Sequence, residues 1–212
     1  MKKNVPEFNA EHLRPLDYMQ APDPRWKAFG RVTEKGFESI SLERYAQPIQ
    51  EIALNEEVPK SVAVHFETAK NLALFAWHVY RFIPVAELYA FISVEFALRE
   101  KTGDRKAPFK KILQRAIEEG WLSNEEFSQW KRATEQRAMQ REQALELAKA
   151  LDSEPPEDPQ YWDYLAVLKE HIPYFRNNYA HGTSSISPWA YKALEDSAEI
   201  INQLFPSSKA HA

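Results

Sequence analysis

The sequence contains no cysteine, which excludes disulfide bonds and thiolate metal sites and fits a cytoplasmic protein. It has only five glycines among 212 residues, whereas Ala, Leu, Glu, Lys, Arg and Gln recur, and this balance favours helix over sheet. The most apolar run, 72–82, is interrupted by His78 and Arg81 and is too short and too polar to span a bilayer. We therefore expect a helical, cytoplasmic protein with no contact with a membrane.

Other features are also scarce. The lysines at the N-terminus are not followed by an apolar stretch, so the sequence predicts no signal peptide. The net charge is −4, and therefore no global electrostatic field attracts nucleic acid. Any binding of RNA has to come from a local basic patch.

The chain divides into three parts by composition. Residues 1–40 are rich in proline and charge and have no clear periodicity, which predicts an irregular N-terminal extension. We expect this extension either to pack on the domain through Trp26 and Phe29 or to be partly mobile. Residues 41–206 are predicted to form one helical domain, and 207–212 a C-terminal tail. No alternating run of apolar and polar residues indicates a sheet.

Apolar residues recur at intervals of three and four through the domain and predict about seven helices. In the third, Leu88, Ile92 and Phe96 form the expected apolar stripe, with Glu95 on the same face. The fold class is therefore all-α, an up-and-down helical bundle. The first expected helix starts after residue 41 and bends or ends near 48. The other six are expected at about 59–82, 84–103, 108–119, 124–151, 159–182 and 188–205.

The segment RNNYAHG, 176–182, places a permanent cation and a titratable imidazole five residues apart, where a helix is expected to end. Gly182 can take the left-handed conformation that ends a helix. The guanidinium of Arg176 is a planar fork of donors suited to phosphate oxygens. Histidine titrates near neutral pH, so His181 can transfer protons. The alternative is a purely structural role for Arg176 and His181, since cations near a helix C-terminus interact favourably with the helix dipole.

This segment resembles the signature of the HEPN superfamily (higher eukaryote and prokaryote nucleotide-binding domains), in which Arg, a polar residue, three further residues and His lie near a helix end. The similarity extends to the stretches 86–88, 94–99, 172–177 and 193–205, and covers about the last two thirds of the chain. Many members of that family are metal-independent ribonucleases, usually homodimers, often working in toxin–antitoxin or defence systems. The resemblance therefore implies a HEPN-like bundle, an RNA substrate and an antitoxin-like protein partner. The first 40 residues and the charged helix 124–151 depart from the minimal family domain.

Metal-free RNA cleavage uses the ribose 2′-hydroxyl as nucleophile, so the protein has to move protons and neutralise charge on the phosphate. We assign catalytic roles to Arg176 as a phosphate clamp, His181 as the proton-transfer group and Asn177 as the residue that orients the imidazole or binds the phosphate. Asn178, Tyr179 and Glu95 are assigned to substrate binding.

The spacing raises a geometric question. At about 100° per residue, Arg176 and His181 point about 140° apart on an ideal helix. They converge if the helix unwinds before Gly182, or if two identical chains lend residues to one shared cleft, and we predict the homodimer with a composite site. Glu95 is expected either to pair with Arg99, four residues later, or to contact the Arg176 site.

We assign no metal and no cofactor, because no carboxylate or third histidine stands at ligand spacing from His171 and His181. The predicted function is a metal-independent endoribonuclease acting on single-stranded RNA. Two alternatives stay open: a non-catalytic helical module that binds a nucleotide, RNA or a partner protein, and a purely structural dimer.

Overall fold

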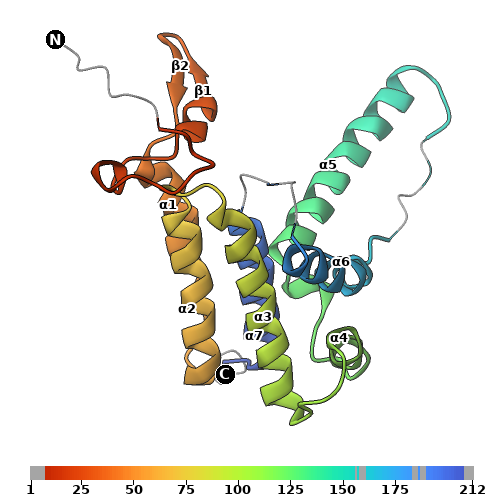
Figure 1. The fold of residues 1–212 in the computed structure, drawn as a ribbon. Helices are drawn as coiled ribbons and strands as arrows, with labels where there is room; N and C mark the ends of the chain where they lie inside the picture. Colours follow the sequence, from red (N-terminus) through yellow and green to blue (C-terminus); the bar gives the residue numbers. More distant parts are fainter. Residues whose placement is uncertain (1–7, 156, 158–160, 183–185, 187–189, 208–212) are drawn as a thin grey trace.

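The computed structural model of the chain describes residues 8–155, 157, 161–182, 186 and 190–207. These residues form seven α-helices and a small antiparallel hairpin (Figure 1). The predicted all-α bundle is confirmed. The helices are α1 (Leu42–Glu51), α2 (Lys60–Phe75), α3 (Phe82–Thr102), α4 (Phe109–Glu118), α5 (Ser128–Ala150), α6 (Tyr164–Ala180) and α7 (Ala190–Leu204).

Helix α3 is the centre of the bundle. Helices α2 and α7 lie alongside it, and α4 and α6 pack against it and run across the bundle (Figure 1). Ala86, Ala90 and Ala97 on α3 are completely buried, and small side chains let neighbouring helices approach closely. The buried face of α3 is therefore not the predicted stripe at Leu88 and Ile92, both of which are only partly buried.

The boundary between α2 and α3 differs from the prediction. A single helix was expected to continue to residue 82, but α2 ends at Phe75 and α3 begins at Phe82. The six residues between them include Trp77 and Tyr80, both buried. Apolar periodicity alone does not reveal this break, since its cause is a contact with a distant part of the chain.

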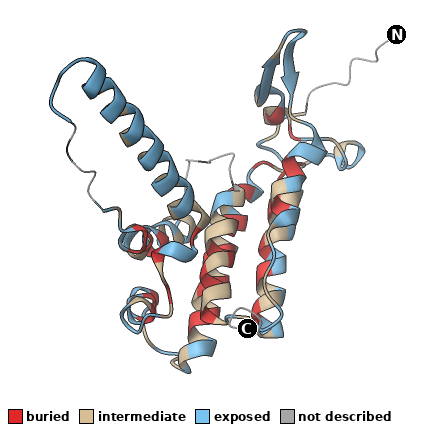
Figure 2. Cartoon of the chain, turned by 180° about the vertical axis from the view of Figure 1, so that it is seen from behind, coloured by how far each residue is buried: buried red, intermediate tan, exposed pale blue. Residues whose placement is uncertain are grey.

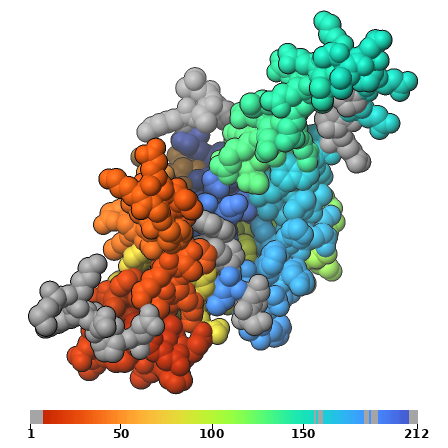
Figure 3. Space-filling view, turned by 90° about the horizontal axis from the view of Figure 1, so that it is seen from above, coloured from red at the N-terminus to blue at the C-terminus, as the bar shows by residue number. Residues whose placement is uncertain are grey.

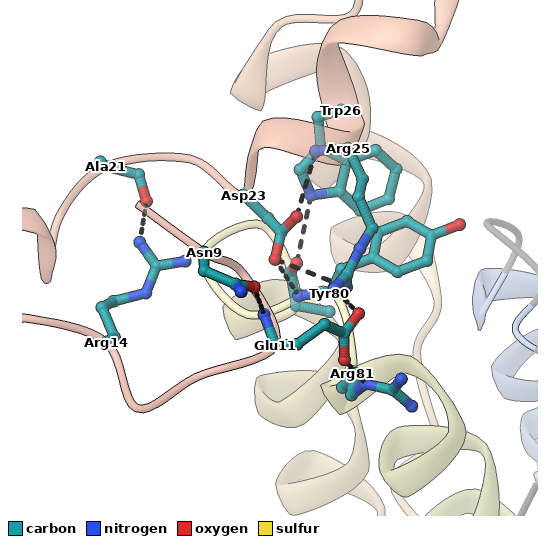
Figure 4. Close-up of polar contacts among 10 residues, drawn as sticks. Asn9, Glu11, Arg14, Ala21, Asp23, Arg25, Trp26, Tyr80 and Arg81 are labelled. Atoms are coloured by element: carbon teal, nitrogen blue, oxygen red, sulfur yellow. Dashed lines mark hydrogen bonds and ion pairs between the residues drawn. The ribbon is translucent and has the colours of Figure 1, made fainter. Parts of the chain in front are cut away.

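That contact is made by residues 8–29 of the N-terminal extension, here named the N-terminal segment (Figure 4). The Asp23 N–H donates to the Trp77 carbonyl at 2.8 Å, and the Asp23 carboxylate accepts from the Tyr80 N–H at 3.1 Å. The indole Nε1 of Trp26 donates to the Ala76 carbonyl at 3.1 Å. Residues of the segment thus bond backbone groups that the end of α2 leaves without helical partners.

The same segment is held by charge. The Glu11 carboxylate pairs with both Arg25 and Arg81, and so links the segment to the start of α3 (Figure 4). Trp26 is 3% exposed, and Phe29 packs against the core beside it. From residue 8 onward, the extension therefore packs on the domain through these two rings, the first of the two expected arrangements.

The N-terminal extension is more regular than its composition indicated. Strands β1 (Gly30–Thr33) and β2 (Gly36–Ser39) pair antiparallel, with Gly30 opposite Ser39. The prediction of no sheet was wrong here, because the hairpin is mostly exposed and lacks the alternation of a half-buried strand (Figure 2).

Helix α5 projects from the bundle, and most of its length is exposed (Figure 2). Its start is fixed by Trp130, whose indole Nε1 donates to the Trp162 carbonyl at 3.0 Å. Seen from above, α5 and the N-terminal segment lie at opposite ends of the molecule (Figure 3). Both depart from a minimal bundle, and the candidate site lies in neither.

Two predicted helix starts, at 158–159 and at 187–188, lie outside the described residues. Helix α6 itself begins later than predicted, at Tyr164, where the Asp163 carboxylate accepts from the Ala166 N–H at 3.1 Å. Helix α4 matches its prediction to within one residue at each end. Within the described ranges, none of the helices combines the length and apolar character needed to cross a bilayer.

Candidate functional site

Helix α6 carries the RNNYAHG segment and stays regular to its end. The His181 N–H donates to the Asn177 carbonyl at 3.0 Å, which is the helical pattern, and Gly182 then takes a left-handed φ of +91°. The helix therefore does not unwind before Gly182. Arg176 and His181 leave it about 140° apart, so the first of the two expected ways to bring them together is wrong.

Arg176 is held by the carboxylate of Glu95 on α3. Its Nη2 donates to Glu95 Oε2 at 3.1 Å, and its Nη1 donates to Asn177 Oδ1 at 3.2 Å. The other Glu95 oxygen accepts from Arg99 Nη2 at 2.7 Å. Both partners expected for Glu95 are therefore present, and one carboxylate lies between two guanidinium groups.

These residues belong to a pocket of about 820 Å³ between α3, α4 and α6, here named the cationic pocket. Four side chains that line it are cations and two are carboxylates. Both carboxylates are neutralised, because Glu95 pairs with two arginines and Glu170 pairs with Lys110 at 2.6 Å. The charged and titratable lining residues are Glu95, Arg99, Lys106, Lys110, Glu170, His171 and Arg176. The pocket is therefore a local basic patch on a chain with net negative charge.

Asn178 and Tyr179 line a different cavity. This second pocket, of about 500 Å³ between α3, α6 and α7, is here named the carboxyl pocket because Glu87 and Asp196 line it. His171 lines both pockets, so the two cavities share a border on α6. The six predicted site residues are thus divided between two neighbouring cavities and the end of the helix.

His181 lies at that helix end, exposed to solvent, and does not line the cationic pocket among the residues described. It follows Asn177 by four residues, so the two share a face of α6. Asn177 lines the cationic pocket. His181 therefore lies about 6 Å further along the helix axis than a residue of the pocket wall, on the same side.

Burial changes the acid–base behaviour of the carboxyl pocket. Desolvation raises the pKa of Glu87 to about 7, although a hydrogen bond from the Tyr179 hydroxyl acts in the opposite direction. Desolvation also raises the pKa of Asp196 to about 7, and the Tyr164 hydroxyl donates to its carboxylate at 2.7 Å. Burial is the main cause of the raised pKa of Tyr164 and Tyr179, and the neighbouring carboxylate is the second cause in each case. Two carboxyl groups that titrate near neutrality thus face one cavity.

Several of these residues were not among the sequence predictions. Glu87 shares the buried face of α3 with Ala90 and Val94, at helical spacing, and a charge in such a stripe was the available signal. His171 was considered only as a metal ligand. Lys106 and Lys110 carry no local signal, because their approach to Arg176 depends on how α4 packs against α6.

Comparison with protein-family models, with curated proteins and with solved structures finds no match for this chain. Among the residues described, no group of three or more His, Asp or Glu side chains is arranged to hold a metal ion.

Proposed function

We propose that this protein is a metal-independent endoribonuclease of HEPN type that cleaves single-stranded RNA. The observation that supports it most is the position of Arg176, held by Glu95 in the wall of the cationic pocket. Its Nε is buried without a hydrogen-bond partner in the described part of the chain. An oriented arginine beside further cations suits a phosphodiester.

The proposed reaction needs only the RNA and the protein. A base removes the proton from the ribose 2′-oxygen, which attacks phosphorus, and the bond from phosphorus to the 5′ oxygen breaks. The leaving 5′ oxygen takes up a proton, giving a 2′,3′-cyclic phosphate and a 5′-hydroxyl. Arg176 stabilises the charge that grows on the phosphate oxygens, and Asn177 binds the phosphate beside it.

His181 is assigned the proton transfer, because it lies beyond Asn177 on the same helix face. Since its direction differs by about 140° from that of Arg176, we propose that two copies of the chain pair and share their residues across one cleft. His171 is the rival for this role, since it lines the cationic pocket within a single chain.

Cleavage of end-labelled single-stranded RNA in EDTA tests the assignment. His181→Ala is expected to lower the rate by about 100- to 10,000-fold, while His12→Ala, which removes an exposed histidine of the N-terminal segment, leaves it unchanged. If His171→Ala abolishes cleavage and His181→Ala does not, the proton-transfer role belongs to His171. If EDTA stops cleavage, the proposed mechanism is wrong.

Mixing two inactive variants tests the shared cleft. Random pairing of Arg176→Ala chains with His181→Ala chains makes half of the dimers mixed. The shared cleft of each mixed dimer keeps one Arg176 and one His181 of the two pairs, so about a quarter of the activity returns. No recovery, or a monomer by light scattering at micromolar concentration, contradicts the composite site.

A non-catalytic binding module is the second candidate, favoured by the fact that His181 does not line the cationic pocket among the described residues. It predicts RNA binding that Arg176→Ala weakens, with no cleavage under any condition. On the resemblance alone, we further propose a cytoplasmic toxin–antitoxin or defence setting with an antitoxin-like partner. Neutralisation of the ribonuclease by the product of an adjacent gene tests this setting.

A further inference from the structure

The carboxyl pocket has no role in the phosphate chemistry proposed above. Its wall contains Glu87, a side chain only 6% exposed whose Oε2 has no hydrogen-bond partner in the described part of the chain. An unpaired oxygen on a buried carboxyl group is unfavourable, and native proteins rarely keep one without a reason. That oxygen is itself inaccessible to solvent, so an N–H donor of a ligand in the pocket would satisfy it after a rotation of the Glu87 side chain.

The pocket also presents flat aromatic surfaces. The ring of Tyr179 is parallel to that of Phe91 within 3°, with centroids 6.4 Å apart, and is stacked on Phe175 at 5.9 Å. All three side chains line the pocket. Aromatic faces of this kind stack on planar heterocycles in proteins that bind single-stranded nucleic acid.

The two pockets separate charge along α6. The carboxyl pocket contains Glu87, Asp196 and one cation, Lys192; the cationic pocket contains four cations and two paired carboxylates, and His171 borders both. A polyamine would match the carboxylates, but the neighbouring cations would repel it. A molecule that combines a neutral ring carrying N–H donors with an attached phosphate matches both pockets at once.

We propose that the carboxyl pocket is a base-recognition site that binds guanine of the RNA substrate, with Glu87 as the specificity-determining residue. This inference rests on the proposed action on RNA. Guanine presents two adjacent donors, its N1–H and its exocyclic amino group, and an ionised carboxylate has acceptors only. Adenine and cytosine each place an acceptor beside a donor, so one of their atoms would face a carboxylate oxygen without a proton between them.

The protonation state gives the site a signature. Burial raises the pKa of both Glu87 and Asp196, which line this pocket, to about 7. A ligand that needs the ionised form of Glu87 binds more tightly as the pH rises through that value, and Glu87→Gln removes the part of the trend that belongs to this carboxylate. Guanine requires this direction. A base that accepts a proton from the neutral carboxyl group gives the opposite trend.

Isothermal titration with 5′-GMP and 5′-AMP tests the proposal on the whole chain. We expect GMP to bind at least about tenfold more tightly than AMP, and Glu87→Gln to weaken GMP by about tenfold or more without weakening AMP, because the amide offers adenine a donor beside an acceptor. The matched control is Glu100→Gln, which changes an exposed carboxylate on the same helix and should leave both affinities unchanged. Circular dichroism establishes that each variant is folded. If Glu87→Gln does not fold, the pH dependence of GMP binding by the wild type replaces it, and an affinity that does not rise with pH overturns the inference.

Equal affinities for GMP and AMP, or GMP affinity that Glu87→Gln leaves intact, would overturn the inference. Its failure is distinguishable from that of the ribonuclease proposal. Chelator-resistant cleavage without any preference for guanine keeps the enzyme and removes the base site. Selective, Glu87-dependent binding of GMP by a chain that never cleaves RNA keeps the base site and removes the enzyme.

Discussion

The buried carboxyl group of Glu87 makes the stability of this protein depend on pH in a way that one substitution can isolate. Glu87→Gln keeps the shape and the buried position of the side chain but removes its titration. Glu87 is 6% exposed, and burial raises its pKa from the ordinary value of 4.5 to about 7. We predict that the variant is more stable than the wild type at alkaline pH and gains nothing in acid.

The sign and size follow from linkage. A raised pKa means that the folded protein binds the proton more tightly than the unfolded chain. The stability that this proton contributes is therefore fully present below pH 4.5 and is lost as the pH rises through about 7. One pKa unit corresponds to about 1.4 kcal/mol, so the ionised carboxylate lowers the free energy of unfolding by about 3 kcal/mol above pH 7. The neutral amide of the Glu87→Gln variant carries no such penalty.

Urea unfolding of both proteins, followed by circular dichroism at several pH values between about 4.5 and 8.5, measures the difference. Taking the difference between variant and wild type removes the contributions of Asp196 and Glu199, whose pKa values are also raised by burial. The expected difference grows from near zero to about 3 kcal/mol across this range. A difference that is constant with pH, or that shrinks toward alkaline pH, refutes the reasoning. Glu100→Gln should show no such trend.

Three further predictions concern other contacts. Glu95→Gln removes the carboxylate shared by Arg99 and Arg176 and is expected to destabilise the fold by about 1–3 kcal/mol in urea unfolding; unchanged stability would mean that the two ion pairs contribute nothing. Trp26→Ala empties a site that is 3% exposed, so we expect a loss of about 3–5 kcal/mol and faster proteolysis within the N-terminal segment; wild-type resistance would contradict its anchoring role. Lys110→Gln should weaken RNA binding equally for all sequences and reduce the salt slope by about one; an unchanged slope would place the RNA elsewhere.

Local sequence signals predicted the structure correctly where residues close together in the sequence determine it. Helix α4 lies between a proline and a glycine, and its predicted bounds agree with the structure to within one residue. The left-handed conformation of Gly182 follows the same rule. The early end of α2 at Phe75 was missed, because no glycine or proline marks it and the backbone groups after it bond to Asp23 and Trp26, about fifty residues earlier.

The candidate site likewise has parts that the sequence predicted and parts that it did not. Glu95 was expected either to pair with Arg99, from helical spacing, or to contact the Arg176 site, as a functional residue, and both contacts are present. The cationic pocket could not be predicted, because Lys106 and Lys110 reach it through the packing of α4 on α6. Glu87 was missed, since the apolar stripe of α3 was placed along Leu88 and Ile92 and not on the buried face that carries this carboxylate.

The central claim is that Arg176 and its pocket direct the transesterification of RNA with no metal ion. The most direct measurement is the chemical nature of the new 3′ end formed in the presence of excess chelator. We predict that the wild type forms a 2′,3′-cyclic phosphate and that Arg176→Ala forms at least about 100-fold less of this product. An intact substrate with the wild type, a 3′-hydroxyl end, or an equal yield from the variant would contradict it.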